Sequence, residues 1–584
     1  MTARAGWLRP VAIASAVVAA LLVATSVPAI AALRFPDPDD VLRMVQVRDL
    51  LAGQGWFDLT QHRLDAPNGG VPMHWSRLVD IPLAVLMWVL TPLLGASQAE
   101  TVTAVVVPLL TLGCALALVG RLAARLTGKK SVLFACLALA LSVPVLSQVL
   151  PLRVDHHGWQ IVLALAALSA VMSSNAVRGG WVAGAAMATW LSISLEGLPM
   201  VAAISGVLAL RWLQRPEEKA WFVHTMVALA MGSIGLFLAT RGIGDLTDHC
   251  DQTSPVHLAV LGWAALGSLA LARLDPRLLP WRFVGLAAVA AGGAMILMSV
   301  APACARGGFA GMDPLVEEFW YRGIAEGQPL WQQPVGVFVQ TVVPALIGLC
   351  GVYSLWRRAD DETSRSRWLE YALLLGAALG VALLVTRAGA VAGAFAAVPF
   401  GWCLQRWLAQ LRTARPLVRI GVLTGVLVLG LVAILPGTRY WPLRGNAPAS
   451  VQAPQRANEC GIAEAAPILA ALSKGEILSP MDIGPRLLHD TPHTVIASAH
   501  HRGEKGMHFA IATFLGTPEA AHTALTQRGT AYVALCPDSN ELIRFREAAP
   551  HGFVAQLADG NRFDWLEPLP VPADSNLKMW RIAP

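Results

Sequence analysis

Long apolar runs recur along most of the chain, and they limit its possible folds more than any other feature. The first run covers residues 11–32, long enough to cross a bilayer as a helix, and many more follow before residue 437. Only 14% of the 584 residues are charged, whereas an average soluble protein carries about 25%. The sequence therefore predicts an all-α polytopic membrane protein.

About thirteen spans are expected, once one apolar run is set aside. Counting residues 81–95 as a span would place the basic loop 121–130 outside the membrane, against the positive-inside rule. We therefore expect 81–95 to be a non-spanning helix in the outer interface, and 11–32 to be an uncleaved anchor with a cytoplasmic N-terminus. The expected spans are 11–32, 101–120, 131–150, 158–176, 180–195, 197–213, 220–240, 256–272, 281–300, 336–356, 369–386, 390–405 and 417–436.

This topology puts several loops and the C-terminal tail on the outer side. Residues 1–436 are then a membrane domain and residues 437–584 a periplasmic domain, in the inner (plasma) membrane of a bacterium. Within the tail, Thr517 before Pro518 predicts the start of a capped helix, and "TAYVALCP" predicts a strand, so this domain is expected to be α/β. The outer segments are 34–80, 151–157, 241–255, 301–335 and 437–584.

Four of the eight cysteines fall on the predicted outer side, and the other four fall inside spans. In an oxidising compartment we expect Cys250 to pair with Cys304, and Cys460 with Cys536. Four free thiols are the alternative.

Polar residues cluster at two places on the outer face early in the chain. "FPDPDDVLRM" carries Asp37 and Asp39 ahead of Arg43, and its prolines predict an extended backbone. In "DHH", an extended backbone would turn Asp155 and His157 to one side and His156 away. A carboxylate and an imidazole so placed suit a divalent cation, Mn²⁺ or Mg²⁺. A solvated acidic loop and a polar interface cap are the alternative interpretations.

Two further candidates lie late in the membrane domain. Glu326 stands in the short motif "GIAE" of the outer loop 301–335. Arg387, in "LLVTRAGAVAG", has no acidic neighbour in sequence at the outer end of its span. A guanidinium there could hold a phosphate or contact lipid headgroups without specificity.

Taken together, these motifs resemble those of the GT-C membrane glycosyltransferases, and within them the catalytic subunit of oligosaccharyltransferase and its bacterial and archaeal relatives. That family carries an Asp six residues before an Arg just after the first span, as Asp37 and Arg43 stand in "DPDDVLR". Its archaeal second motif is similar to "DHH" and its Thr-Ile-x-Glu motif to "GIAE", and its Arg at the outer end of the eleventh span is matched by Arg387. The likeness covers residues 30–440.

The resemblance implies roles for these residues. Asp37, Asp155 and His157 would hold the divalent cation, with Asp39 as the alternative to Asp37, and Arg387 would contact the donor phosphate. Glu326, or the Asp37 carboxylate, would act on the acceptor. The implied activity is an inverting, metal-dependent transfer of a sugar or oligosaccharide from a polyprenyl-phosphate or -pyrophosphate donor to an acceptor at the outer face.

Departures from the family leave the acceptor open. Gly323 replaces the Thr of the Thr-Ile-x-Glu motif, and the tail contains no Trp-Trp pair to read an Asn-x-Ser/Thr sequon. A protein, a lipid or a glycan could be the acceptor, and the basic residues lie in short loops rather than in a nucleic-acid patch. The alternatives are a lipid or glycan transporter or flippase, a non-catalytic scaffold, and a single-sugar transferase of the protein mannosyltransferase or lipid A aminoarabinose transferase type.

Overall fold

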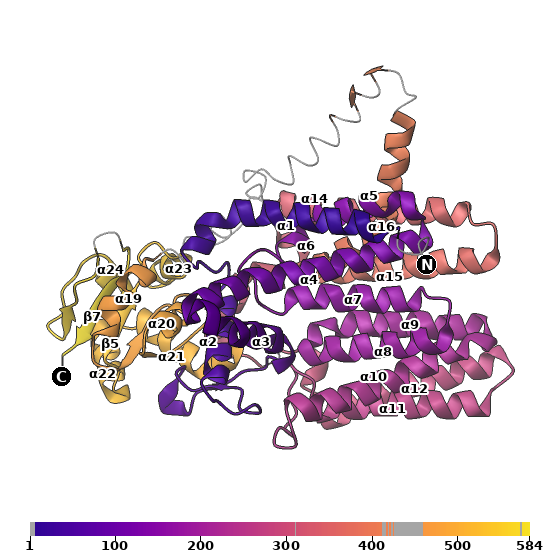
Figure 1. Ribbon diagram of the computed structural model, residues 1–584. Coiled ribbons are helices and arrows are strands. Elements are labelled where there is room, and N and C mark those ends of the chain that lie inside the picture. Colours follow the sequence, from indigo (N-terminus) through magenta and orange to yellow (C-terminus); the bar gives the residue numbers. More distant parts are fainter. Residues whose placement is uncertain are drawn as a thin grey trace.

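The chain folds into a long bundle of helices with a smaller mixed domain at one end (Figure 1). This computed structural model describes residues 6–309, 311–411, 460–572 and 575–583, together with residues 416, 417, 420, 421 and 424. The long helices of the membrane part are α1 Leu8–Ala31, α2 Pro38–Leu51, α3 Arg77–Leu94, α4 Ala96–Leu126, α7 His157–Val171, α8 Ala176–Ile193, α9 Leu198–Gln214, α10 Lys219–Thr240, α11 Pro255–Leu274, α12 Leu279–Val300, α14 Val335–Arg357, α15 Glu362–Leu384 and α16 Gly389–Leu411.

The prediction of an all-α polytopic membrane protein is confirmed. Ten helical segments in the described residues are long and apolar enough to cross a membrane, which makes this a multi-pass membrane protein. The count of about thirteen is not confirmed. The expected span 131–150 is broken into α5 Val132–Ala140 and α6 Val143–Leu146, because Pro144 lacks the N–H needed to continue α5. The expected span 417–436 lies almost entirely outside the described residues.

The run at 81–95 forms most of α3, which lies beside α2 at the end of the bundle that faces the tail (Figure 1). By length and composition α3 is itself one of the ten candidate spans. Its non-spanning position in the outer interface therefore stays a prediction.

Small residues let neighbouring helices approach closely within the bundle. At Gly184 in α8, a Cβ atom would lie 2.4 Å from the carbonyl oxygen of Thr225 in α10. Such close backbone contact is a common way to pack helices where lipid removes the hydrophobic drive between them.

The tail is a small α/β domain around a five-stranded sheet, as predicted. Its strand order is β4-β3-β5-β7-β6; β3 is parallel to β4 and β5, and β7 is antiparallel to β5 and β6. Thr517 caps α22 by accepting the N–H of Ala520, which confirms the predicted helix start. The boundary expected at 436/437 lies outside the described residues. The tail elements are α19 Ile462–Ala470, β3 Glu476–Leu478, α20 Gly484–Asp490, β4 Thr494–Val495, α21 Glu504–Leu515, α22 Pro518–Arg528, β5 Tyr532–Leu535, α23 Asn540–Ala548, α24 Phe553–Ala558, β6 Leu566–Pro568 and β7 Lys578–Ile582.

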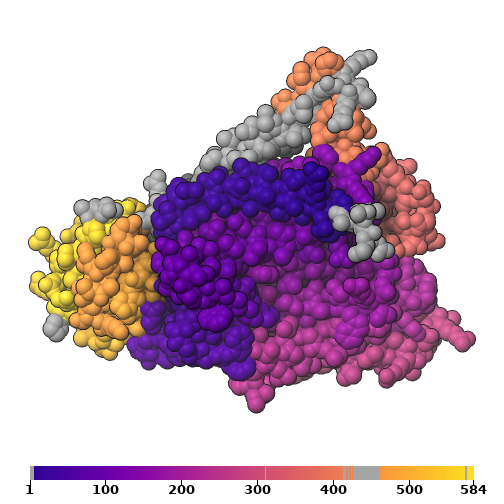
Figure 2. All heavy atoms as spheres, in the orientation of Figure 1, coloured from indigo at the N-terminus to yellow at the C-terminus, as the bar shows by residue number. Residues whose placement is uncertain are grey.

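Residues 34–80, which we call the first outer loop after the predicted topology, pack directly against the tail, and the space-filling view shows the two as a continuous surface (Figure 2). This loop contains the short hairpin β1 Thr60–Gln61 and β2 Val71–Pro72. Leu64 pairs with Val495 at the edge of the tail sheet, and one buried apolar cluster contains Leu64, Trp75 and Ile477. The tail is therefore not a freely tethered module, because it shares a core with the membrane part.

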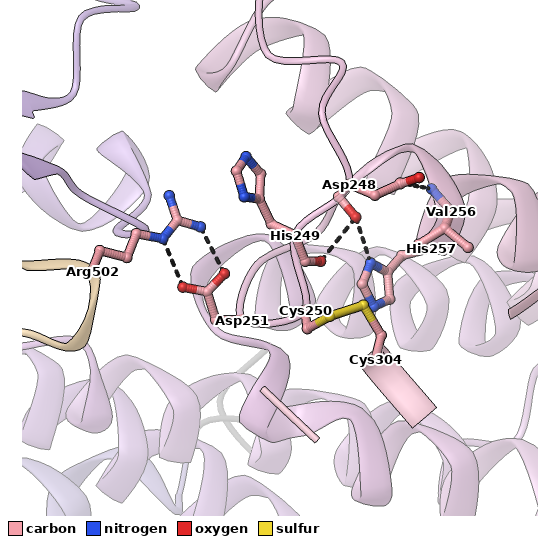
Figure 3. Close-up of a disulfide and its surroundings, with 9 residues drawn as sticks. Asp248, His249, Cys250, Asp251, Val256, His257, Cys304 and Arg502 are labelled. Atoms are coloured by element: carbon pink, nitrogen blue, oxygen red, sulfur yellow. Dashed lines mark hydrogen bonds and ion pairs between the residues drawn. A yellow bond between two sulfur atoms is a disulfide. The ribbon is translucent and has the colours of Figure 1, made fainter. Parts of the chain in front are cut away.

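The structure joins Cys250 to Cys304, and Cys460 to Cys536, in the two pairings expected from the sequence. The first disulfide links the outer loop after α10 to the loop after α12 (Figure 3). The other four cysteines are free.

Candidate functional site

The acidic stretch after α1 is extended only up to Asp37, because α2 begins at Pro38 and places Asp39 in a helix, which corrects the expectation from its prolines. Pro38 occupies the first position of α2, where its fixed φ favours a helix start, and Asp37 caps the helix. One Asp37 oxygen accepts the N–H of Asp39 at 2.9 Å, and the other lies 3.1 Å from Nη1 of Arg153. Both carboxylate oxygens of Asp37 are therefore engaged.

Asp39 lies in the first turn of α2, and no described residue forms a hydrogen bond or ion pair with its carboxylate. Burial, together with the neighbouring charges of Asp37 and Asp155, raises the pKa of Asp39 well above its ordinary value. The start of α2 thus presents one free carboxylate beside a fully engaged one.

Asp155 lies at the centre of a buried network. Arg43 donates to it at 3.2 Å and to Asp80 at 2.9 Å, and Arg43 and Asp80 are completely buried. Burial alone would raise the pKa of Asp155, but the hydrogen-bonded His156 and nearby Arg43 lower it well below its ordinary value. Arg43 therefore fixes the position of the Asp155 carboxylate.

The two histidines after Asp155 both contact it. His157 Nε2 lies 3.3 Å from one oxygen of Asp155, so the predicted convergence of these two residues is found. His156 does not point away as expected, since its Nδ1 lies 2.6 Å from the other oxygen. The reason is local: the chain turns into α7 at His157 instead of staying extended.

Glu326 and Arg387 come to the same place from the late part of the chain. Glu326 lies 3.9 Å from His157 Nε2 and 3.7 Å from Nη1 of Arg387, and 37% of its side chain is exposed. Thr386 donates both its N–H and its hydroxyl to the carbonyl of Gln328, which holds the Glu326 loop against the end of α15.

Glu196, between α8 and α9, was missed in the sequence. It accepts from Arg387 at 2.7 Å and from Gln160 at 3.1 Å. Arg387 has no acidic neighbour in sequence, yet in space it is paired. The signal was present, because the expected spans 180–195 and 197–213 flank Glu196, and the alternation of spans puts the connection between these two on the same side as Arg387.

These residues form one half-open site, which we call the carboxylate site: Asp39, Asp155, His157, Glu196, Glu326 and Arg387. Asp155, His156 and His157 are close enough for three ligand atoms to hold one metal ion. Nε of Arg387 is buried and has no hydrogen-bond partner in the described part of the chain, so one guanidinium donor is unused. The site can therefore hold a cation and an anion side by side.

Comparison of the sequence with protein families and with curated proteins finds no match. Solved structures do resemble the chain. The archaeal oligosaccharyltransferase AglB from Archaeoglobus fulgidus, in complex with an inhibitory peptide and a dolichol-phosphate, matches with a TM-score of 0.65 and 14% identity, over 96% of this chain and 72% of that chain.

Two other structures of the Archaeoglobus fulgidus oligosaccharyltransferase match as well. One, tethered with an acceptor peptide containing the NVT sequon via a disulfide bond, has a TM-score of 0.63 at 14% identity, over 97% of this chain and 73% of that chain. One in complex with Zn and sulfate has a TM-score of 0.57 at 13% identity, over 94% and 69%. These likenesses show that the chain has the GT-C fold indicated by its motifs.

Proposed function

We propose that this protein is a membrane glycosyltransferase that moves a sugar or oligosaccharide from a polyprenyl-phosphate or -pyrophosphate donor to an acceptor at the outer face. One observation carries the proposal. Asp155, His157, Glu326 and Arg387 are up to 232 residues apart in sequence, yet they are linked by contacts of 3.3 to 3.9 Å. The fold they occupy is that of an enzyme solved with a dolichol-phosphate.

A divalent cation fits the carboxylate site. Asp155 and His157 would be ligands, and the third would come from His156, which groups with them, or from Asp37 or Asp39 at the start of α2. The Archaeoglobus enzyme of the same fold was solved in complex with Zn and sulfate, which supports a divalent cation in a protein of this fold. When bound, Mn²⁺ or Mg²⁺ supplies Lewis-acid neutralisation of the negative charge on the leaving phosphate.

Arg387 would bind the donor phosphate. Its Nη1 is paired with Glu196, which fixes the direction of the guanidinium, whereas its buried Nε has no partner in the described residues. A phosphate oxygen accepting from the unused edge would gain a charge-assisted hydrogen bond from a donor already held in place. Glu196 is thus a positioning residue in this scheme.

Glu326 would orient the acceptor nucleophile and take its proton. It contacts both His157 and Arg387, at 3.9 and 3.7 Å, and 37% of its side chain is exposed to an incoming acceptor. Inversion at the anomeric carbon, which the family resemblance implies, is part of the same proposal.

The test is complementation of a deletion strain, with lipid-linked sugars and envelope glycans measured by mass spectrometry. We expect the strain that carries Asp155→Asn to accumulate lipid-linked sugar and lose its glycosylated product, as the deletion does. Asp564→Asn, which alters an exposed carboxylate in the tail, should restore the wild-type profile. Full complementation by Asp155→Asn at equal protein level would overturn the proposal.

A further inference from the structure

Three histidines from distant parts of the chain meet beyond the carboxylate site. His74 follows β2 in the first outer loop, while His500 and His501 lie in the tail, after β4. The centroids of the three rings are 4.7 to 5.0 Å apart, and one ring nitrogen of each lies within 4.8 Å of the others. We call these residues the histidine cluster.

The spacing of the nitrogens suits zinc. Nδ1 of His74 lies 2.9 Å from Nε2 of His500, and ligand nitrogens in a tetrahedral zinc site are about 3.3 Å apart, given Zn–N bonds of about 2.0–2.1 Å. Imidazole is a preferred zinc ligand. A small adjustment of three side chains would therefore form a three-histidine site.

The ring of His501 is already oriented as a metal ligand would be. Its Nε2 lies 2.6 Å from a carboxylate oxygen of Asp251, and the same carboxylate accepts two hydrogen bonds at 2.7 Å from Arg502 (Figure 3). A carboxylate that accepts from one nitrogen of a histidine fixes its tautomer and directs the other nitrogen to a metal. Asp251 is itself held in place, because its neighbour Cys250 is joined to Cys304.

The cluster is also left with an unsatisfied polar atom. His500 is 2% exposed, and its Nδ1 is buried without a hydrogen-bond partner in the described residues. Buried polar groups in proteins are nearly always satisfied, so hydrogen bonds within the described residues do not account for all the nitrogens of this ring, whose Nε2 already lies beside His74. A cation is the ligand that three converging nitrogen lone pairs would accept.

We propose that His74, His500 and His501 form a structural zinc site, separate from the carboxylate site, that fastens the tail to the outer loops. The ligands come from the first outer loop and the tail, and Asp251 adds the loop after α10. Phe309, in the loop that also carries Glu326, packs its ring against His501 at 5.1 Å. One ion would thus lock three outer loops to the tail. This inference does not depend on glycosyl transfer.

The experiment measures zinc per chain by mass spectrometry on the full-length protein, purified in detergent, loaded with zinc and dialysed. We expect His74→Gln to lose one equivalent of tightly bound zinc relative to wild type. His62→Gln is the matched control, because His62 lies in the same loop with 61% of its side chain exposed. Equal zinc contents in all three proteins would overturn the proposal.

A second measurement covers the possibility that His74→Gln fails to fold. In the Asp155→Asn protein, whose carboxylate site is impaired, chelation should lower the melting temperature by at least about 3 °C, and added zinc should restore it. Cobalt in place of zinc should give the visible absorption of a four-coordinate nitrogen site. If chelation leaves the melting temperature unchanged, the three rings are packed imidazoles without a metal.

Discussion

The carboxylate site and the histidine cluster differ in exposure and in the charge of their partners. The carboxylate site contains Glu326, which is 37% exposed, and its charged groups are only partly paired, as the free Nε of Arg387 shows. The histidine cluster is half-buried, with only His500 fully buried among its three rings, and the one carboxylate that contacts it in the described residues, Asp251, is occupied by His501 and Arg502. A site with unused charge can bind charged ligands, whereas imidazole nitrogens beside a carboxylate that is already paired suit a small metal ion.

The two sites are nevertheless connected. The guanidinium of Arg43, which holds Asp155, lies 4.5 Å from the ring of Trp75, and that ring lies 5.1 Å from the ring of His500. A cation–π contact and an aromatic edge contact thus bridge them. If the two sites act independently despite this bridge, substitutions at the carboxylate site should change glycosyl transfer, and substitutions around the histidine cluster should change the stability of the fold.

The largest expected effect is that of Arg387→Gln on transfer. Removing a fixed donor to a developing phosphate charge should lower kcat/KM by about 1000-fold, or about 4 kcal/mol in the barrier, with the melting temperature little changed. The measurement is transfer by the purified protein from a polyprenyl-linked sugar. Arg322→Gln is the control, since Arg322 lies in the Glu326 loop with 62% of its side chain exposed. A loss in kcat/KM below about threefold for Arg387→Gln would contradict the proposal that Arg387 binds the donor phosphate.

The next largest effect is on stability, from Cys250→Ser. The Cys250–Cys304 bond closes a loop of 54 residues beside Asp251, and losing it should reduce the free energy of unfolding by about 3 kcal/mol. Cys114→Ser, at a free and exposed cysteine in α4, should leave the unfolding curve unchanged. Transfer at low temperature should stay within about twofold of wild type. A Cys250→Ser protein that is folded but inactive would show that the two sites cannot be separated.

Much of this arrangement could be predicted from sequence, because successive spans cross the membrane in alternating directions. The order of the spans then decides on which side of the membrane each connecting residue lies. Once the spans alternate, Asp155, Glu326 and Arg387 must lie on one face, and their residue types indicate the chemistry. The cap at Thr517 was likewise readable, since it depends only on neighbours.

What could not be predicted depends on contacts between distant segments. His74 and His500 are 426 residues apart, and nothing in the sequence near either one indicates the other. The wrong expectation of an extended backbone at Asp39 had a different cause. Pro36 and Pro38 favour an extended backbone before each proline, but Pro38 also favours the first position of a helix, and tertiary packing of α2 decided between them.

The smallest expected effect concerns a buried carboxylate of the tail. Glu541 is buried and accepts the N–H groups of Met481 and Asp482; burial and the charge of Asp482 raise the pKa of Glu541 to about 8. Burial and the charge of Asp37 likewise raise the pKa of Asp482 to about 6.

Because the folded protein binds this proton more tightly than the unfolded chain does, the contribution of Glu541 to stability is fully present below about pH 4 and falls as the pH rises towards 8. Glu541→Gln cannot titrate, so its melting temperature should vary less between pH 5 and pH 8 than that of wild type, by about 2 °C. Glu547→Gln, at an exposed position of the same helix α23, should keep the wild-type slope. If Glu541→Gln also keeps that slope, Glu541 is already ionised throughout this range. The tail then carries more negative charge at neutral pH than the burial of Glu541 implies.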